Sequence, residues 1–240
     1  MRTNETVSLL CNHVSVRDFT GEPIAPEDFD AIIEAARASS STCFLQLTSI
    51  VRVTDPEKRA KMAVYAGNQA QVVNAAEFIV FCVDFRRDLR VCGEADLGWA
   101  EQLVAGCVDT GIMAQSALTA AESLGLGGCF IGGLRNHIRE VGELLELPEH
   151  TFALVGLTLG HPAKRNDLKP RIPVSMLLSE NAYRDATDEE LAAYDKVLTN
   201  YYGDRGMPGT TWKGKLDPIL ARERRPFVQA YLNEQGFNRK

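Results

Sequence analysis

Apolar residues recur along the chain at two spacings, which predict a mixture of helices and strands. After Pro26, the apolar residues Phe29, Ile32, Ile33 and Ala36 would share one helical face. A proline in the first turn followed by acids favours a helix start there. Short runs that are apolar throughout are typical of strands buried on both faces. Further helices are predicted over residues 7–12, 56–65, 97–126 and 138–145, and strands over 49–54, 78–83, 129–131 and 152–159.

The stretch 97–126 is the longest predicted helix and is rich in alanine and glycine. Small residues let another backbone approach closely, so we expect this helix at the centre of the domain or at a subunit contact. Asp109, Gln115 and Glu122 interrupt its apolar residues. A membrane-spanning helix rarely tolerates such residues, so we expect no membrane association.

The pattern changes after Ala163. Residues 164–171 are polar, and two helical stretches follow from Asp188 around a loop at 203–209; the second, 217–235, should break at Pro226. Such a tail cannot form a core alone. We therefore expect one domain over 1–240, with a core of about 1–163 and an extended, helical excursion of about 164–240. Strands separated by helices indicate an α/β or α+β fold.

The composition of the chain disfavours several classes of protein and of site. The 240 residues carry 26 Lys and Arg against 32 Asp and Glu, a net charge of −6, which disfavours a nucleic-acid-binding protein. The six cysteines form no C-x-x-C pair and the four histidines have no metal-ligand spacing. We therefore expect no disulfide framework and no metal site. Free thiols, and a start without a targeting signal, fit the cytoplasm.

Three segments could together bind one phosphorylated planar ligand. His13, Ser15 and Arg17 alternate, so in an extended loop they share one side and suit phosphate oxygens. Lys169 and Arg171 are interleaved with prolines that hold the backbone extended. Taken singly, the first segment is better explained as a solvated turn and the second as an exposed connector.

The third segment, 127–135, is rich in glycine, which permits close approach of backbone to a flat ring. Its glycines could also simply end a helix and a strand. It is not a dinucleotide fingerprint, because Phe130 stands where Gly125-x-Gly127 would require glycine or alanine, and a helix precedes it instead of a strand.

Together with these segments, further motifs carry a family resemblance. They are Ser39–Gln46, Ala75–Phe81, Ala121–Asn136, Asp167–Pro173 and Arg225-Pro226-Phe227. Over essentially its whole length the chain resembles the oxygen-insensitive NADPH nitroreductase and NADPH–flavin oxidoreductase group of the FMN-dependent nitroreductase superfamily. The resemblance implies an α+β fold with a central, mostly antiparallel sheet flanked by helices. It also implies a homodimer, with the C-terminal extension packed on the partner subunit and FMN at the subunit interface.

The resemblance further implies a ping-pong reaction. NADPH passes a hydride to flavin N5, and a nitroaromatic, quinone or similar small-molecule acceptor then takes two electrons. No side chain need act as an acid or a nucleophile, because the flavin carries the chemistry. The implied FMN contacts are His13, Ser15, Arg17, Ser41, Gln69, Phe130, Ile131, Gly132, Gly133, Lys169 and Arg171. The implied contacts of substrate and NADPH are Cys43, Phe44, Arg135, Arg205 and Arg225.

The sequence departs from the family pattern at three places. Val14 stands where relatives often have arginine, Cys43 where serine is frequent, and Met207-Pro208-Gly209 forms a loop poorer in arginine. The preference for NADPH over NADH therefore stays open. A flavin reductase that supplies free reduced FMN is an alternative within the family. A flavin-binding module without turnover is a second alternative, which the arginines 135, 205 and 225 disfavour.

Overall fold

The structure is a computed structural model that describes residues 3–240. The chain divides into two compact units, residues 1–166 together with 225–240, and residues 167–224. The first unit holds α1 (Glu5–Cys11), α2 (Pro26–Arg37), η1 (Thr42–Phe44), β1 (Thr48–Arg52), α3 (Pro56–Tyr65), α4 (Gln71–Asn74), β2 (Glu77–Asp84), α5 (Arg86–Cys92), α6 (Ala100–Ser123), β3 (Gly127–Ile131), η2 (Gly132–His137), α7 (Ile138–Leu144), β4 (Thr151–Gly160) and α11 (Phe227–Glu234). The second unit holds α8 (Val174–Leu177), α9 (Asp188–Gly203) and α10 (Trp212–Leu220).

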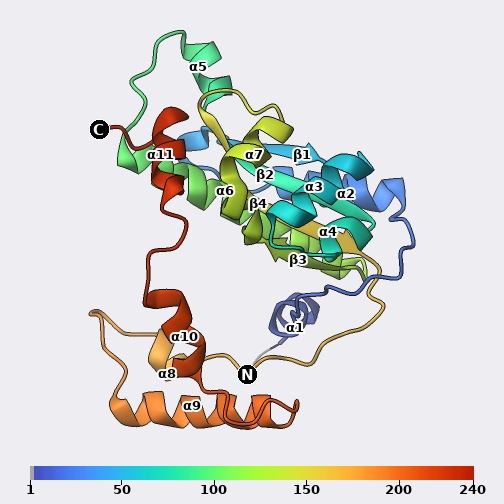
Figure 1. The fold of residues 1–240 in the computed structure, drawn as a ribbon, viewed down its shortest axis with the longest axis vertical. Coiled ribbons are helices and arrows are strands. Elements are labelled where there is room, and N and C mark those ends of the chain that lie inside the picture. Colours follow the sequence, from blue (N-terminus) through green and yellow to red (C-terminus); the bar gives the residue numbers. More distant parts are fainter. Residues whose placement is uncertain (1–2) are drawn as a thin grey trace. The chain divides into compact units, whose positions relative to one another are not determined.

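Four strands form one antiparallel sheet in the order β1-β2-β4-β3. The two central strands, β2 and β4, are those predicted from continuous apolar runs, and every residue of β2 is buried. Side chains alternate between the faces of a strand. Ile79 and Phe81 therefore pack with α2 and α6, whereas Phe78 and Val80 pack with α3 and α7. Figure 1 shows the sheet with helices on both faces, an α+β architecture as predicted.

The long helix α6 lies at the centre of this unit. Ala114, Ala117 and Ala121 are buried against α2 and the sheet, and a Cβ added at Gly106 would lie 2.6 Å from Val83 Cγ1. Small residues thus let α6 approach β2 closely. Among residues 3–240, α6 is the one helix long and apolar enough to span a membrane by length and composition. Core helices of soluble proteins pass the same test, and this helix packs into a core.

The second unit has its own small core on α9. Tyr194, Leu198 and Tyr202 lie on one face of α9 and pack with Ile172 and Trp212. The Thr187 hydroxyl accepts from Glu190 N, and the Glu190 carboxylate accepts from Thr187 N, which closes the start of the helix.

The predicted break at Pro226 is confirmed, because two separate helices stand where the helical stretch 217–235 was expected. The bounds of that stretch are wrong. Instead α10 begins at Trp212, where the Thr211 side chain accepts from Gly214 N, and it ends at Leu220. Pro226 stands directly before α11, with φ −59°. A proline is favourable at a helix start because it gives up no intrahelical hydrogen bond there.

Candidate functional site

The segment 13–17 runs beside the start of β3. Val16 is buried, and its N–H donates to the Gly128 carbonyl at 2.9 Å. A Cβ added at Gly127 would lie 2.5 Å from Val16 Cγ2. Ser15 is only partly buried and Arg17 is exposed. Burial of Val16 therefore fixes the segment against the sheet and leaves the guanidinium of Arg17 at the surface, where it makes no hydrogen bond or ion pair with residues 3–240.

A carboxylate of α6 orients His13. The Nδ1 atom of His13 lies 2.6 Å from Oε1 of Glu122, whose side chain is 10% exposed. Because a carboxylate accepts, Nδ1 donates in this contact. Nε2 is then the ring nitrogen left for a ligand.

A second acidic residue of α6 holds the loop that carries Ser41, Cys43 and Phe44. Both carboxylate oxygens of Asp109 accept from Thr42 N at 3.0 Å, and Oδ1 also accepts from Thr42 Oγ1 at 2.9 Å. Asp109 is 4% exposed. Such a buried carboxylate requires these hydrogen bonds. They connect the loop to the helix at the centre of the core.

The same loop has an unusual backbone. Cys43, Phe44 and Gln46 have φ values of 49°, 60° and 58°, a region that non-glycine residues rarely adopt. The Ser41 hydroxyl accepts from Gln46 N at 3.1 Å, and the Phe44 side chain is 80% exposed. Clusters of such residues occur at ligand sites, where the surrounding structure holds them in place.

Gln69 and Gly133 lie in direct contact. A Cβ added at Gly133 would lie 2.3 Å from the Ala66 carbonyl oxygen and 2.6 Å from Gln69 Nε2. The Gln69 amide is fixed from both ends, because Nε2 donates to the Ala66 carbonyl at 2.8 Å and Oε1 accepts from Gln71 Nε2 at 2.7 Å. The start of η2 and the loop after α3 are therefore in contact at a position where only glycine fits.

The other glycines of this segment serve packing. A Cβ at Gly128 would lie 2.7 Å from the Thr158 carbonyl oxygen and 2.8 Å from Leu118 Cδ1. Both Gly127 and Gly128 are buried within β3. The interpretation of these two as a backbone surface for a ring is therefore replaced by close packing in the sheet. Ile131 is fully buried, whereas Phe130, Gly132 and Gly133 are only partly buried.

The two arginines of the first unit that were predicted to contact substrate and NADPH make hydrogen bonds to protein groups. The Arg135 guanidinium donates to the Leu154 carbonyl of β4, and burial lowers the pKa of this arginine. Nε of Arg225 donates to Asn136 Oδ1 at 2.9 Å. Asn136 belongs to the same motif as Arg135, so the residues before α11 are anchored at η2.

In the second unit, the extended segment 169–173 is held from one side. The Tyr194 hydroxyl donates to the Pro170 carbonyl at 3.0 Å, and Ile172 packs on the α9 core. Lys169, which precedes the first anchor, and Arg171, which lies between the two, are exposed. Arg205 donates to Asp167 Oδ2 at 2.5 Å, and its guanidinium lies 3.7 Å from the centre of the Tyr201 ring.

Direct contacts thus join only part of the predicted set. Gly133 contacts Gln69, and a Cβ at Gly132 would lie 3.3 Å from an Arg135 nitrogen. Asp109 and Glu122 were not predicted as site residues, although Asp109 holds the loop of Ser41 and Glu122 contacts His13. Their signal was present, because an acid among the buried alanines of a helix must find a hydrogen-bond partner.

Comparison with known proteins identifies the family. Residues 11–161 match the model of the nitroreductase family, and residues 169–240 match that of the nitroreductase family C-terminal domain. The chain belongs to the nitroreductase family. It is 50% identical to the oxygen-insensitive NADPH nitroreductase of Salmonella typhimurium over 97% of this chain and 98% of that protein.

Solved structures agree with this assignment. The crystal structure of nitroreductase A from Vibrio parahaemolyticus superposes with a TM-score of 0.96 at 45% identity and covers 100% of both chains. The NADPH:FMN oxidoreductase of Vibrio harveyi, solved with NAD⁺, gives a TM-score of 0.94 at 43% identity, over 99% of this chain and 100% of that one. The nitroreductase fold predicted from the sequence is therefore confirmed.

Proposed function

We propose that this chain is an FMN-dependent NAD(P)H oxidoreductase that reduces nitroaromatics, quinones or similar small acceptors by two electrons. The observation that carries the proposal is similarity over nearly the whole length to an NADPH nitroreductase and an NADPH:FMN oxidoreductase. Both family models match in chain order, so the similarity includes the core and the C-terminal excursion.

The residues of the first unit suit FMN. Arg17 offers an exposed guanidinium, which matches phosphate in geometry and charge. The imidazole of His13 is oriented by Glu122. Ser15 lies between His13 and Arg17 in the sequence. A Cβ added at Gly133 would meet the Ala66 carbonyl and the Gln69 amide. This glycine therefore lets the backbone pack directly on Gln69 and keeps the Gln69 amide in place.

Bound FMN would accept hydride from the coenzyme and release two electrons to the acceptor. The side chains and backbone of this protein would bind FMN and orient the coenzyme and the acceptor against it. We assign His13, Ser15 and Arg17 to phosphate and ribityl oxygens, Ser41 and Gln69 to the ring edge, and Phe130–Gly133 to the backbone beside the reacting atom. Lys169 and Arg171 are assigned to FMN from the family resemblance. The exposed Phe44 and Cys43 would contact the nicotinamide or the acceptor.

Coenzyme selection is assigned to arginines. A 2′-phosphate distinguishes NADPH from NADH, and guanidinium groups bind phosphate with two parallel hydrogen bonds. Arg205 is held by Asp167 and stacked on Tyr201, so little freedom is lost when it binds an anion. Arg135 and Arg225 complete the assigned set.

The proposal includes a homodimer in the cytoplasm, with FMN at the subunit interface. On α6 the side chains of Val104, Val108 and Ile112 follow one another at a spacing of four residues and are 55%, 50% and 43% exposed. An exposed apolar stripe on a core helix is typical of a subunit contact. All six cysteines are free thiols, which suits a reducing compartment.

Two alternatives stay open to test. Free FMN could be the acceptor, since one relative is an NADPH:FMN oxidoreductase; the chain would then supply reduced flavin to another protein. A flavin-binding module without turnover needs no site for the coenzyme phosphate, so the rigidly held Arg205 disfavours it.

The first experiment mixes the purified, FMN-loaded protein with NADPH or NADH without oxygen and follows the visible absorbance of the flavin. We expect rapid bleaching with NADPH, slower bleaching with NADH, and return of the colour when a nitroaromatic or quinone is added. Equal rates with both coenzymes would contradict the phosphate role of Arg205. A yellow protein that neither coenzyme bleaches would contradict the oxidoreductase and favour the binding module. Return of colour with free FMN but with neither acceptor would favour the flavin reductase.

A further inference from the structure

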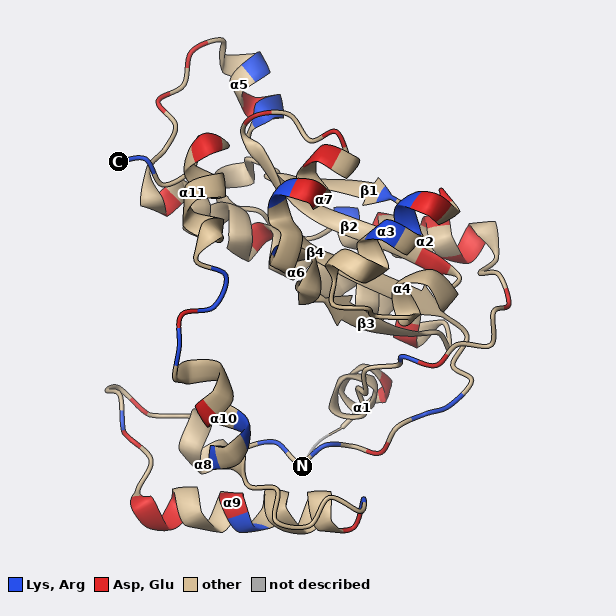
Figure 2. Cartoon of the chain, in the orientation of Figure 1, with Lys and Arg blue, Asp and Glu red and all other residues tan. Residues whose placement is uncertain are grey.

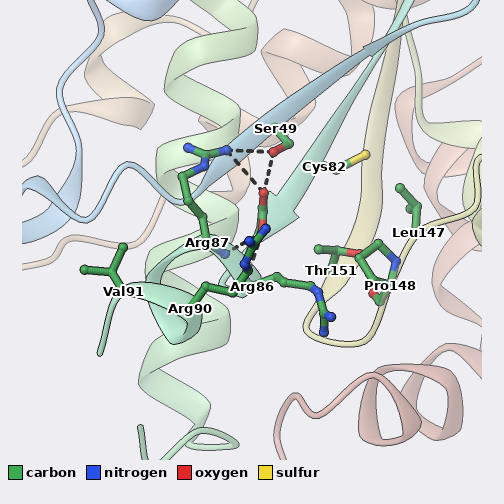
Figure 3. Close-up of a pocket in the computed structure, with 10 residues that line it drawn as sticks. Ser49, Cys82, Arg86, Arg87, Arg90, Val91, Leu147, Pro148 and Thr151 are labelled. Atoms are coloured by element: carbon green, nitrogen blue, oxygen red, sulfur yellow. Dashed lines mark hydrogen bonds and ion pairs between the residues drawn. The ribbon is translucent and has the colours of Figure 1, made fainter. Parts of the chain in front are cut away.

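A cavity of about 640 Å³ lies beside α5 and shares no residue with the set assigned to FMN, coenzyme and acceptor. Three arginines of one short helix, Arg86, Arg87 and Arg90, line it (Figure 3). Figure 2 shows α5 as one of the places where basic residues gather on a chain of net charge −6. All three arginines are exposed, so the cavity is open to solvent on the side of α5.

Arg87 is a structural residue of the cavity wall. It donates to Ser49 Oγ at 2.8 Å and to Asp84 Oδ2 at 3.2 Å. The Asp84 carboxylate also accepts from the backbone N–H of Arg86 at 2.9 Å and from the Ser49 hydroxyl. The acid of the cavity is therefore already compensated by a cation and by neutral donors.

The side chains of Arg86 and Arg90 make no hydrogen bond or ion pair with residues 3–240, although both line the cavity. They are four residues apart on α5 and so lie on the same helix face, where like charges repel and destabilise the helix. An anion between them would remove this repulsion. Two guanidinium groups that share one anion are a recurring arrangement for phosphate and carboxylate.

The rest of the cavity is partly apolar. Leu147 and Pro148 line it opposite α5, as Figure 3 shows, and Val91 lies at its edge with 83% of the side chain exposed. Thr151 donates its hydroxyl proton to the Pro148 carbonyl, so it adds no free donor. The volume is within the range of small-molecule sites, which combine apolar walls with a few charged groups.

We propose that this cavity binds a small organic phosphate monoester, with the phosphate between Arg86 and Arg90 and an apolar or planar part against Leu147, Pro148 and Val91. The site is separate from the proposed oxidoreductase site, and occupancy requires no turnover.

The test is a calorimetric titration of the FMN-loaded protein with phenyl phosphate in a phosphate-free buffer. We expect saturable binding with a dissociation constant of about 1 mM or tighter. The double variant Arg86→Ser, Arg90→Ser should bind about tenfold more weakly or not at all, because charge-assisted hydrogen bonds are lost. Inorganic phosphate should bind more weakly than phenyl phosphate, and phenol should show no binding.

The control variant Arg37→Ser, Lys61→Ser removes the same charge from exposed positions on α2 and α3 and should bind like the unchanged protein. FMN content and NADPH oxidation should be the same in both variants, which shows that each is folded. Equal affinity of the Arg86→Ser, Arg90→Ser variant and the unchanged protein would overturn the proposal, because the phosphate would then bind elsewhere. So would the absence of saturable binding to the unchanged protein, or equal affinity for phenyl phosphate and inorganic phosphate.

Discussion

Single buried carboxylates position the loops of the candidate site. Asp109 accepts three hydrogen bonds from Thr42, and Glu122 orients His13. Three of the four residues 43–46 have positive φ, a conformation that the backbone does not adopt without support. The Asp109 carboxylate supplies this support, so we interpret it as a positioning residue for Ser41, Cys43 and Phe44.

The variant Asp109→Asn should loosen this loop. A carboxamide offers one oxygen where the carboxylate uses two, and the lost charge-assisted hydrogen bonds are worth about 1–2 kcal/mol. We expect FMN affinity to fall up to about tenfold and KM for the acceptor to rise, with a smaller change in kcat. Fluorescence titration of FMN and steady-state kinetics measure these effects.

Two further variants test whether the effect comes from the hydrogen bonds of Asp109. Thr42→Val removes one of the three hydrogen bonds and should give a weaker change in the same direction. Glu101→Gln removes one negative charge from an exposed position of the same helix and should change neither quantity. If folded Asp109→Asn binds FMN and acceptor like the unchanged protein, the loop does not depend on this carboxylate.

At the same scale, the sequence showed which residues are unusual but not which groups they would contact. Asp109 and Glu122 were visible only as interruptions of an apolar helix, because their partners lie 67 and 109 residues away along the chain. Gly133 was predicted to let the backbone approach a flat ring, and that contact stays a prediction. The close contacts that the structure shows are with the Ala66 carbonyl and Gln69, and only the fold brings these groups there.

Among the elements, those with a strong hydrophobic period were predicted well. The predicted helix 56–65 coincides with α3, and the predicted strand 78–83 lies within β2. Short elements such as α4 and α5 were missed. The four residues of α4 do not establish a helical period, and in α5 charged residues leave too few apolar positions to show one. The bounds of α10 and α11 were wrong, because hydrophobicity alone does not show that Pro226 begins a helix.

The docking of α11 makes the stability of the first unit sensitive to alkaline pH. Tyr231 is 3% exposed, and a Cβ added at Gly142 of α7 would lie 2.3 Å from its hydroxyl oxygen. Burial raises the pKa of Tyr231 to about 12, from an ordinary value of about 10. A raised pKa means that folding favours the neutral phenol. Its contribution is complete below pH 10 and is lost as pH rises toward 12.

We therefore expect Tyr231→Phe to reduce the loss of stability between pH 10 and 12 by about 2 kcal/mol. Denaturant titrations at several pH values measure this slope. A residual slope should remain, because burial also raises the pKa of Cys82 to about 12. Tyr183→Phe should change the slope much less. The hydrogen bond to Asp185 raises the pKa of Tyr183 as well, but this side chain is 86% exposed and water screens the contact. An identical slope in Tyr231→Phe and the unchanged protein would contradict the role of Tyr231.

At the scale of the whole molecule, the proposed homodimer gives one helix two functions. The buried face of α6 packs on the sheet and supplies Asp109 and Glu122 to the loops, while its exposed face presents Val104, Val108 and Ile112. The small-residue pattern predicted either a central helix or a subunit contact and could not choose. The fold confirms the central position, and the exposed stripe supports the contact as well, because in a single chain these side chains would face water.

This double role makes α6 the place to test the homodimer. In a monomer, Val108→Asp would put a charge on a solvated helix face at little cost, whereas in the proposed dimer it would bury an unpaired carboxylate. We expect the variant to sediment as a monomer of about half the mass and to lose FMN on dilution, since the cofactor is assigned to the subunit interface. Val64→Asp on α3, at a site 59% exposed, should stay dimeric and retain FMN. If Val108→Asp stays dimeric, the contact lies on another face; if it becomes monomeric yet retains FMN as tightly as before, one subunit is sufficient for the cofactor and the interface site is wrong.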